Sequence, residues 1–461
     1  MDICVIGAGY VGLVTSLCLA YFGNRIIVVD ADKNKLAKLK EGKAPFFEPG
    51  LEVLLKGCGD LVEFSDNLEH GVKNSEIIFI AVGTPSLKDG EPDLSQVMAV
   101  ARSIGAALDD SRKRIIVNKS TVPVGSGNWV EMLVHQGLQA VSTVPARAGK
   151  PTKANFAVVS NPEFLREGSA IADSLYPDRI VVGGNDEHAV NSMKTLYRPI
   201  LNQDFIPPTF APRPESYTGA PFLVTDLASA EMIKYSANAF LAMKISFANE
   251  MAGLCERVGA DVRQVMAGIG LDYRIGKAFL NAGVGWGGSC FGKDVKALMN
   301  VAKEYNYSTK LLEATIDMNE RQRMVPITKL QEALKIIKGR TIGLMGLSFK
   351  PNTDDLRDAP SLTIASQLIK MGAQVKAYDP VSIPVCRQTR PDLDIVYAEN
   401  LIDLASDANA LILVTEWSEF IDADWQKLAS VMKSPIIIDG RNALSVKALQ
   451  SAGFDYRGIG Q

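Results

Sequence analysis

The pattern GAGYVG at residues 7–12 constrains the fold more than any other stretch of this chain. It lies between the strand-like run ICVI and the helical run YVGLVTSLCLAYFG, which ends at Gly23. The three glycines allow a backbone to approach a pyrophosphate at a helix amino terminus. Asp30 ends the next apolar run, where a carboxylate accepts hydrogen bonds from ribose hydroxyls. The pattern predicts a dinucleotide-binding unit, with a tight turn in a non-binding domain as the alternative, and the charge of Asp30 favours NAD over NADP.

Strand-like and helical patterns alternate in both halves of the chain. The apolar runs are RIIVVD, EIIFIAVGTP, RIIVNKSTVP, NFAVVSNPEF and DRIVVGG in the first half, and RTIGLMGLSF, QVKAYDP, ALILVTEW and PIIIDGRN in the second. Short apolar runs between helices are typical of parallel sheets covered on both faces. The expected fold class is therefore α/β, with two Rossmann-like, doubly wound parallel-sheet domains.

The middle of the chain breaks this alternation. Residues 199–222 contain six prolines and predict an irregular loop. Asp226 is a suitable N-cap for a helix over about residues 227–258, which at 1.5 Å per residue spans about 48 Å. A helix of this length is expected to join two lobes. The predicted domains are a NAD-binding domain at 1–205, a central helical domain at 206–330, and a second Rossmann-like sheet domain at 331–461.

Composition excludes several classes of partner. The 461 residues are 47% hydrophobic and 22% charged, with a formal net charge of −3. Lysines and arginines are dispersed among acids, so no nucleic-acid partner is expected. The first residues lack the basic and apolar regions of a signal peptide, and no run reaches the roughly 18 apolar residues of a membrane span. We therefore expect a cytoplasmic protein with no membrane partner.

The cysteines indicate neither disulfide bonds nor a metal site. The six are scattered without a CxxC spacing, and the three histidines lie near no second ligand in a known spacing. In a reducing compartment such cysteines are thiols, so no metal is expected. Cys290 stands out because it follows the glycine-rich run VGWGGS and precedes Lys293 and Asp294. A lysine beside a loop thiol lowers the thiol pKa, yet a structural thiol fits the residues equally well.

A NAD site gives a cysteine a specific chemical use. Hydride transfer oxidises an alcohol to an aldehyde, but the aldehyde has to add a nucleophile before it loses a second hydride. A cysteine adduct is a thiohemiacetal, its oxidation gives a thioester, and water hydrolyses the thioester to an acid. The combination of NAD and Cys290 therefore suggests oxidation to a carboxylate.

Two pairs of polar residues have helical spacing. Lys234 and Asn238 are four apart on the long predicted helix and share a face, either as a solvated pair or as part of a site among small neighbours. Glu163 and Glu167 in SNPEFLREG are also four apart, just after a predicted strand. Acids in the first turn of a helix explain that second pair equally well.

The chain resembles the UDP-glucose dehydrogenases of the UDP-glucose/GDP-mannose dehydrogenase family along essentially its whole length. The motifs that carry the resemblance are, in family order, GAGYVGL, FEPGL, FIAVGTP, KSTVPVG, SNPEFLREG, DRIVVG, SAEMIKYSANAFLA, FLNAGVGWGGSCFGKD, GLSFKPNTDDLRDAPS, AYDP and DGRN. The stretch around Cys290 is the most discriminating, because relatives that act on GDP-mannose or N-acetylated sugars differ there. The resemblance implies two NAD-dependent oxidations at C6 of UDP-glucose, which give UDP-glucuronate for polysaccharide biosynthesis.

The resemblance also implies that residues 206–330 form a dimerisation domain and that residues 331–461 form a UDP-sugar-binding domain. It further implies roles for individual residues. Cys290 matches the nucleophile, Lys234 and Asn238 the oxyanion site, and Asp294 the carboxylate that orders or activates water. Thr121 and Glu163 match residues that hold a catalytic water. The matching cofactor positions are Gly7, Gly9, Val11, Gly12, Asp30, Lys35, Thr84, Thr121, Glu167, Lys293 and Arg357. The matching substrate positions are Glu163, Phe164, Leu165, Arg166, Glu167, Lys234, Asn238, Arg274, Phe279, Leu280, Asn281, Ala282, Gly283, Gly287, Lys350 and Arg441.

Arg274 matches an arginine contributed across a subunit interface, so a homodimer or higher homo-oligomer is expected.

Three departures from the family pattern stand out. Gly292 replaces a proline or glutamine and is expected to loosen the loop that carries Lys293 and Asp294. Trp286 replaces a smaller aromatic residue, and residues 139–154 and 199–222 look longer than in compact relatives. The alternatives are the same chemistry on UDP-galactose or a UDP-N-acetylhexosamine, or a non-catalytic nucleotide-sugar sensor.

Overall fold

The computed structural model describes residues 1–87, 90–142 and 155–461. The chain forms two compact units, Met1–Ser236 and Ala237–Gln461. The unit boundary lies within the longest helix, α10 (Leu227–Val258). This helix has the bounds that the sequence predicts, and the Oδ1 atom of Asp226 accepts a hydrogen bond from the amide of Ser229 at 2.8 Å, as expected of an N-cap.

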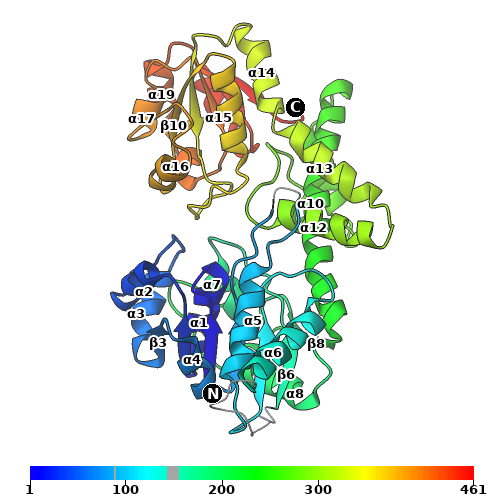
Figure 1. The fold of residues 1–461 in the computed structure, drawn as a ribbon. Helices are drawn as coiled ribbons and strands as arrows, with labels where there is room; N and C mark the ends of the chain where they lie inside the picture. The colour runs from blue at the N-terminus through cyan, green and yellow to red at the C-terminus, as the bar shows by residue number, and fades with distance from the viewer. Residues whose placement is uncertain (88–89, 143–154) are drawn as a thin grey trace. The chain divides into compact units, whose positions relative to one another are not determined.

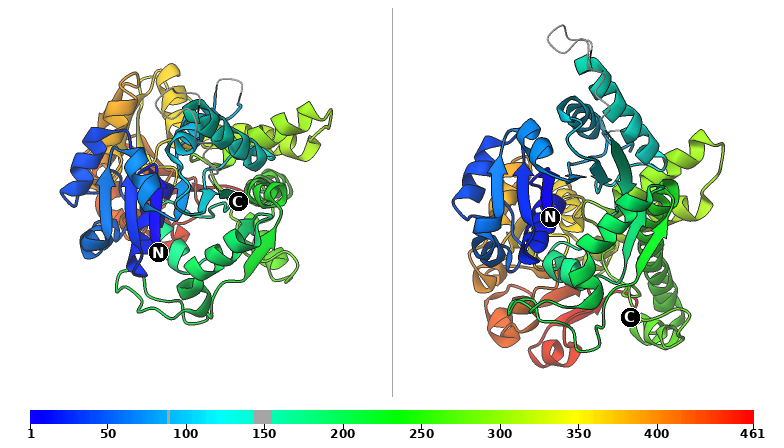
Figure 2. Two further views of the ribbon diagram at one scale, coloured as in Figure 1. Left: turned by 60° about the horizontal axis from the view of Figure 1, so that its bottom comes forward. Right: turned by 90° about the horizontal axis from the view of Figure 1, so that it is seen from below.

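An eight-stranded sheet forms the centre of the N-terminal unit, in the order β3-β2-β1-β4-β5-β6-β7-β8 (Figures 1 and 2). The strands are β1 Asp2–Ile6, β2 Arg25–Val29, β3 Val62–Ser65, β4 Ile77–Ile80, β5 Arg114–Asn118, β6 Phe156–Ser160, β7 Ile180–Gly183 and β8 Phe222–Thr225. The central strands β4 and β5 are buried along their whole length, as in a sheet covered on both faces. The predicted parallel sheet of the first domain is thereby confirmed, with the exception of one strand pair described below.

Helices cover both faces of this sheet (Figure 1). Helices α1, α3 and α7 contribute to one apolar core, and α4, α5 and α6 contribute to the other. The helices of the unit that precede α10 are α1 Tyr10–Tyr21, α2 Lys33–Lys40, α3 Leu51–Gly57, the 3₁₀ helix η1 Gly59–Leu61, α4 Leu68–Asn74, α5 Ser95–Ala107, α6 Ser126–Ser142, α7 Ala170–Leu175, α8 Glu187–Leu196 and α9 Arg198–Asn202.

The C-terminal unit contains an all-parallel, six-stranded sheet in the order β11-β10-β9-β12-β13-β14. Its strands are β9 Thr341–Met345, β10 Gln374–Tyr378, β11 Ile395–Tyr397, β12 Ala410–Leu413, β13 Ile436–Asp439 and β14 Asp455–Gly458. Its helices besides α10 are α11 Val262–Gly270, α12 Phe291–Glu304, α13 Lys310–Gln322, α14 Val325–Leu334, α15 Pro360–Lys370, α16 Ile383–Thr389, α17 Leu401–Ala405, α18 Ser418–Ile421, α19 Trp425–Val431 and α20 Val446–Ser451. The second predicted sheet domain is confirmed.

Two details differ from the sequence prediction, and a third cannot be compared with it. Strands β6 and β7 pair antiparallel through Ser160 and Gly183, so the first sheet is not wholly parallel. The region 199–222 is not irregular throughout, because it overlaps the short helix α9 at its start and reaches β8 at its end. The segment predicted to be unusually long at 139–154 lies mostly outside the described residues.

The predicted domain ranges stay a prediction.

None of the six cysteines, all of which are described, forms a disulfide bond. Within the described ranges, no helix combines the length and apolar character that crossing a bilayer requires.

Two glycines allow helices α5 and α6 to pack closely. A Cβ atom at Gly105 would lie 1.9 Å from the carbonyl oxygen of Val134, and one at Gly137 would lie 2.0 Å from the carbonyl oxygen of Arg102. Both obstacles are backbone atoms, so a side chain could be accommodated only by moving the helices apart.

We predict that Gly105→Ala lowers the stability of the protein by about 1–3 kcal/mol, because the added methyl group forces the two helices apart. Thermal unfolding followed by differential scanning calorimetry measures the effect. The control is Gly268→Ala in α11, where a Cβ atom meets nothing within 4 Å. Equal melting temperatures for the two variants would show that the helix contact is not tight.

Candidate functional site

The glycine-rich turn leaves open space at the amino terminus of α1. Gly7 has a φ of +107°, and a Cβ atom there would lie 2.5 Å from the carbonyl oxygen of Ala81. A Cβ atom at Gly12 would collide with the carbonyl oxygen of Gly7. At Gly9, by contrast, a Cβ atom would meet nothing within 4 Å, and no side chain caps the helix there. The turn therefore fits a pyrophosphate, which helix amino termini bind through free amide groups.

Asp30 lies beside this turn, at the carboxyl end of β2. Its Oδ2 atom accepts hydrogen bonds from the amide of Ala8 at 2.7 Å and from Nζ of Lys35 at 2.8 Å. Burial raises the pKa of Asp30, but Lys35 and the amides of Asp32 and Ala8 outweigh burial and hold the pKa below its ordinary value. The carboxylate is thus ionised and suitably placed to accept hydrogen bonds from a ribose.

Two further predicted cofactor residues meet at the same edge of the sheet. The hydroxyl of Thr84, which follows β4, donates a hydrogen bond to the carbonyl oxygen of Thr121, which follows β5, at 2.8 Å. The carboxyl ends of adjacent parallel strands bring these loops together.

Lys234 and Glu163 form a buried ion pair in the N-terminal unit. The Nζ atom of Lys234 lies 2.9 Å from Oε1 of Glu163, and the two side chains are 4% and 6% exposed. Burial opposes ionisation of Glu163, but Lys234, the amide of Leu165 and Lys119 outweigh it and lower the pKa of Glu163. Lys234 is therefore not a solvated residue, because it is buried against a charge, and its role in a site stays a prediction.

Sequence reasoning missed a second buried lysine beside this pair. Nζ of Lys119 donates hydrogen bonds to the backbone and side-chain oxygens of Asn161 at 3.3 and 3.1 Å. Burial lowers the pKa of Lys119 to about 8, and the positive charge of Lys234 acts in the same direction. The available signal was a lysine placed directly after the apolar run RIIVN in KSTVPVG.

Glu231 is a second missed residue, three positions before Lys234 on α10. Its carboxylate accepts hydrogen bonds from the amides of Gly125 and Gly127 at 2.7 and 2.8 Å, at the amino terminus of α6. Burial raises the pKa of Glu231 to about 7, in spite of these amides. The first part of α10 therefore holds both the loop after β5, through Glu231, and the loop after β6, through Lys234.

The remaining predicted catalytic residues lie in the C-terminal unit. Cys290 is the N-cap residue of α12, and its Sγ atom lies 3.5 Å from the hydroxyl of Ser289. Asp294 is fully buried; it accepts hydrogen bonds at 2.6 Å from Nδ2 of Asn238 and at 2.6 Å from Nζ of Lys293. Asp294, Asn238 and Lys293 thus form one connected group, and the amide of Asp294 donates a hydrogen bond to the carbonyl oxygen of Cys290 at 2.8 Å.

The sequence interpretation of the cysteine region needs a correction. Lys293 and Asp294 do not lie on a loop, because they belong to the first turn of α12. Gly292 lies in the same turn, where a Cβ atom would be 3.3 Å from Oδ2 of Asp358 and 3.6 Å from the ring of Trp286. The departure at Gly292 is therefore within a helix packed against its neighbours.

The glycines before Cys290 are required by the fold itself. A Cβ atom would lie 2.6 Å from Oδ1 of Asn319 at Gly285 and 2.3 Å from the carbonyl oxygen of Asp358 at Gly287. At Gly288 it would collide with the ring of Phe349. These contacts with the protein itself explain why glycines are needed here. The sequence alone had suggested that the glycines make room for a bound ligand.

The other predicted substrate residues of this unit have varied surroundings. Arg441 is largely buried, and its guanidinium donates to the carbonyl oxygens of Val414 and Phe349 at 2.6 and 3.0 Å. Nζ of Lys350 lies 5.3 Å from the ring centre of Phe349, so Lys350 and Arg441 flank the same residue. Arg274 is 73% exposed and pairs with Asp272, which leaves it at the surface.

Further predicted contacts complete this description. Arg357 is also exposed, and its Nε and Nη2 atoms bind the carboxylate of Asp355 at 2.8 and 2.9 Å. Phe279 has a φ of +63°, and its ring centre lies 6.3 Å from that of Phe291. The substrate stretch 280–283 is buried except for Asn281.

The turn after β9 in the second sheet lacks the open space found in the first. The carboxylate of Asp379 accepts hydrogen bonds from the amides of Leu347, Ser348, Val381 and Ser382 at 2.8 to 3.1 Å, and one from Nε1 of Trp417 at 3.2 Å. Asp379 thus binds two amides of this turn, those of Leu347 and Ser348, whereas Asp30 binds one amide, that of Ala8, in the corresponding turn of the first sheet.

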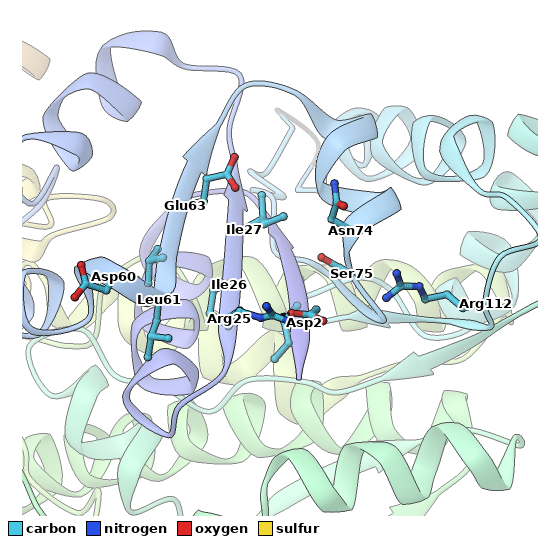
Figure 3. A pocket seen from close by; sticks show the side chains of 12 residues that line it. Asp2, Arg25, Ile26, Ile27, Asp60, Leu61, Glu63, Asn74, Ser75 and Arg112 are labelled. Carbon is cyan, nitrogen blue, oxygen red and sulfur yellow. Dashed lines mark ion pairs between the residues drawn. The ribbon is translucent and has the colours of Figure 1, made fainter.

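A pocket of about 430 Å³ lies away from all these residues (Figure 3). It opens at the amino ends of β1 and β2, where Arg25 pairs with Asp2 at 2.6 Å. Ligands of α/β sheets bind at the carboxyl ends of the strands, so we assign this pocket no part in the site. Among the described residues, no group of three or more histidine, cysteine, aspartate or glutamate side chains could hold a metal ion.

Comparison with known proteins identifies the family. Three domains of the UDP-glucose/GDP-mannose dehydrogenase family match in order: the NAD binding domain at residues 1–201, the central domain at 228–321 and the UDP binding domain at 343–446. The chain belongs to the UDP-glucose/GDP-mannose dehydrogenase family. It is an NAD-dependent dehydrogenase, and the expected cofactor NAD is confirmed.

Relatives within this dehydrogenase family match over the full chain. A UDP-glucose 6-dehydrogenase of Bacillus subtilis is 43% identical and covers 100% of this chain and 93% of its own length. One of Rhizobium meliloti is 44% identical, with 100% of both chains covered. The solved structure of a UDP-glucose dehydrogenase from Pyrobaculum islandicum is 34% identical, with a TM-score of 0.86 and 99% and 97% of the two chains covered.

We predict that Glu231→Gln changes how stability depends on pH. Because the folded protein keeps a proton on Glu231 up to about pH 7, while the unfolded chain releases it near pH 4.5, this carboxyl group costs stability as pH rises through that window. The melting temperature of the wild type should exceed that of the variant most at pH 5, and the difference should shrink by pH 7.5. A difference that does not vary with pH would contradict the raised pKa.

Proposed function

We propose that this dehydrogenase oxidises C6 of UDP-glucose twice, with two molecules of NAD⁺, and releases UDP-glucuronate. UDP-glucose 6-dehydrogenases of two bacteria are 43% and 44% identical to the chain over its whole length, which supports this sugar. The single observation that carries the chemistry is the placement of Cys290 at the amino terminus of α12, four residues before the buried Asp294. Pure nucleotide-sugar binding has no use for such a thiol.

Cys290 is the proposed nucleophile. The positive end of a helix dipole favours an anion at this position, so α12 assists formation of the thiolate. Bound at the glycine-rich turn, NAD⁺ would supply the hydride acceptor for both oxidations. The first converts the C6 alcohol to an aldehyde and releases one proton. The thiol then adds across the carbonyl group to give a thiohemiacetal, which loses a second hydride and a proton to become a thioester.

Hydrolysis of the thioester completes the reaction. Water adds to the carbonyl carbon, the C–S bond breaks, and the products are a carboxylate, a proton and the regenerated thiol. Asp294 is the proposed group that orders or activates this water, held in place by Asn238 and Lys293. The hydrogen bonds from these two donors keep the carboxylate in one orientation.

Lys234 and Asn238 are the proposed partners of the negative oxygen in the adduct. Lys234 is suited to this role because its charge is held in a dry environment by Glu163, where electrostatic stabilisation is strong. Glu163 and Thr121 are the residues proposed to hold a catalytic water. The other cofactor and substrate contacts implied by the resemblance stay predictions.

We also propose that the protein assembles at least as a homodimer through α10. Phe240, Phe247, Leu254 and Val258 recur at spacings of seven, seven and four residues, and they are 57%, 44%, 51% and 68% exposed. Helical periodicity places them on one face, which a second subunit would cover.

We predict that wild-type enzyme forms two NADH per UDP-glucose consumed. The assay counts NADH by absorbance against sugar nucleotide consumed, across UDP-glucose, UDP-galactose and UDP-N-acetylhexosamines. Cys290→Ser should lose turnover by more than about 10³-fold, because a hydroxyl is a poorer nucleophile, while NADH and UDP-glucose still bind. Release of UDP-glucuronate by Cys290→Ser at the wild-type rate would refute the covalent route, and no NADH with any sugar would favour a sensor.

We predict that Phe247→Glu weakens self-association, because burying an unpaired charge in an apolar contact is costly. Light scattering coupled to size-exclusion chromatography measures the mass. Glu250→Gln, also exposed on α10, serves as the control and should keep the wild-type mass. An unchanged mass for Phe247→Glu would place the subunit interface elsewhere.

A further inference from the structure

Glu48 is a buried carboxylate outside every role assigned above. It lies in the FEPGL stretch between α2 and α3 and is 6% exposed. We propose that Glu48 is a positioning residue that holds the glycine-rich cofactor turn and the Glu163–Glu167 stretch in one fixed arrangement for hydride transfer. The inference rests on the proposed function of these two segments.

The contacts of Glu48 connect both segments. Its Oε1 atom accepts a hydrogen bond from the amide of Ala170 at 2.7 Å, and its Oε2 atom accepts one from the amide of Gly168 at 2.6 Å. The hydroxyl of Tyr10 also donates to Oε2 and accepts from the amide of Gly168 at 2.7 Å. Tyr10 is the first residue of α1, directly after Gly9, so one carboxylate joins the start of α1 to Gly168 and Ala170, which directly follow the predicted substrate stretch.

The backbone around Glu48 is fixed on both sides. Before it, the ring of Phe46 packs against that of Tyr10, with centres 4.6 Å apart. After it, Gly50 has a φ of +82°, and a Cβ atom there would collide with the ring of Phe210. Glu48 is thus held in place and does not simply follow the segments that it contacts.

Only a carboxylate satisfies all of these donors. Both of its oxygens accept, whereas a glutamine replaces one of them with an NH₂ group that only donates. In Glu48→Gln this NH₂ group faces the amide of Gly168 or that of Ala170, and at least one buried donor loses its partner. Because glutamine has the same shape as glutamate, Glu48→Gln loses only hydrogen bonds between this side chain and its donors.

The substrate stretch should stay folded when this connection is weakened. Arg166 binds Asp173 through its amide, Nε and Nη2 atoms at 2.8, 3.1 and 2.6 Å. The amide of Leu165 donates to Glu163 at 2.6 Å, and Lys234 still pairs with Glu163. The expected defect is therefore in the placement of the sugar against the cofactor, to which hydride transfer is more sensitive than binding.

The test compares the full-length wild type, Glu48→Gln and Glu41→Gln. Glu41 is an exposed carboxylate that pairs with Lys43 in the same part of the chain, so it serves as the matched control. We expect Glu48→Gln to lower kcat by about 10- to 100-fold. The KM values for NAD and UDP-glucose should change much less, and the kinetic isotope effect with UDP-glucose deuterated at C6 should increase as hydride transfer becomes limiting. Glu41→Gln should match the wild type.

Hydrogen–deuterium exchange provides a readout that does not depend on turnover. The amide that faces the new NH₂ group, that of Gly168 or that of Ala170, should exchange at least 10-fold faster in Glu48→Gln than in Glu41→Gln, since it loses its carboxylate acceptor. Unchanged exchange overturns the connection whatever sugar the enzyme oxidises. Faster exchange with an unchanged kcat, or a lower kcat with an unchanged isotope effect, overturns the positioning role. Absence of NADH formation by the wild type overturns the proposed function, and the catalytic part of this inference with it.

Discussion

The buried ion pair between Lys234 and Glu163 is the interaction on which the N-terminal site depends. The negative charge of Glu163 stabilises the ammonium group of Lys234 away from water, and removing either partner would leave the other charge buried alone. The pair also fixes α10 against the loop after β6, and Glu231 fixes the same helix against the loop after β5. The position of Lys234 is therefore set by α10 together with the loops that follow β5 and β6.

Buried carboxylates that accept backbone amides recur throughout the chain, with different consequences. Glu231 and Glu48 hold loops at the carboxyl ends of the strands in the first sheet. They accept hydrogen bonds from backbone amides of these loops, such as those of Gly127 and Gly168, which need an acceptor when buried. Asp379 closes the corresponding turn of the second sheet with its own oxygens. The two sheets share an architecture, but Asp379 binds more amides of its turn than Asp30 does, and in our proposal the two sheets hold different parts of the ligand set.

The group around Cys290 depends on close packing. Gly285, Gly287 and Gly288 allow the chain to pass against Asn319, Asp358 and Phe349, and this path leads directly into the first turn of α12. A side chain at any of these glycines would displace the start of the helix, and with it the position of Cys290. The hydrogen bonds of Asn238 and Lys293 to Asp294 then fix the carboxylate relative to the thiol's helix.

Sequence patterns were sufficient to predict the two sheets, the bounds of α10, the NAD turn with Asp30, and the family. These follow from local patterns: apolar runs of strand length, glycines at a strand–helix turn, and motifs that are continuous in the chain. Tertiary structure alone decided which charges are paired, because Lys234 and Glu163 are 71 positions apart and only folding shows that they are buried together. The same holds for Glu48, Lys119 and Glu231, whose partners lie on other elements. Two further features depend on residues that are distant in the sequence. These are the position of Asp294 in a helix and the close packing that requires glycines before Cys290.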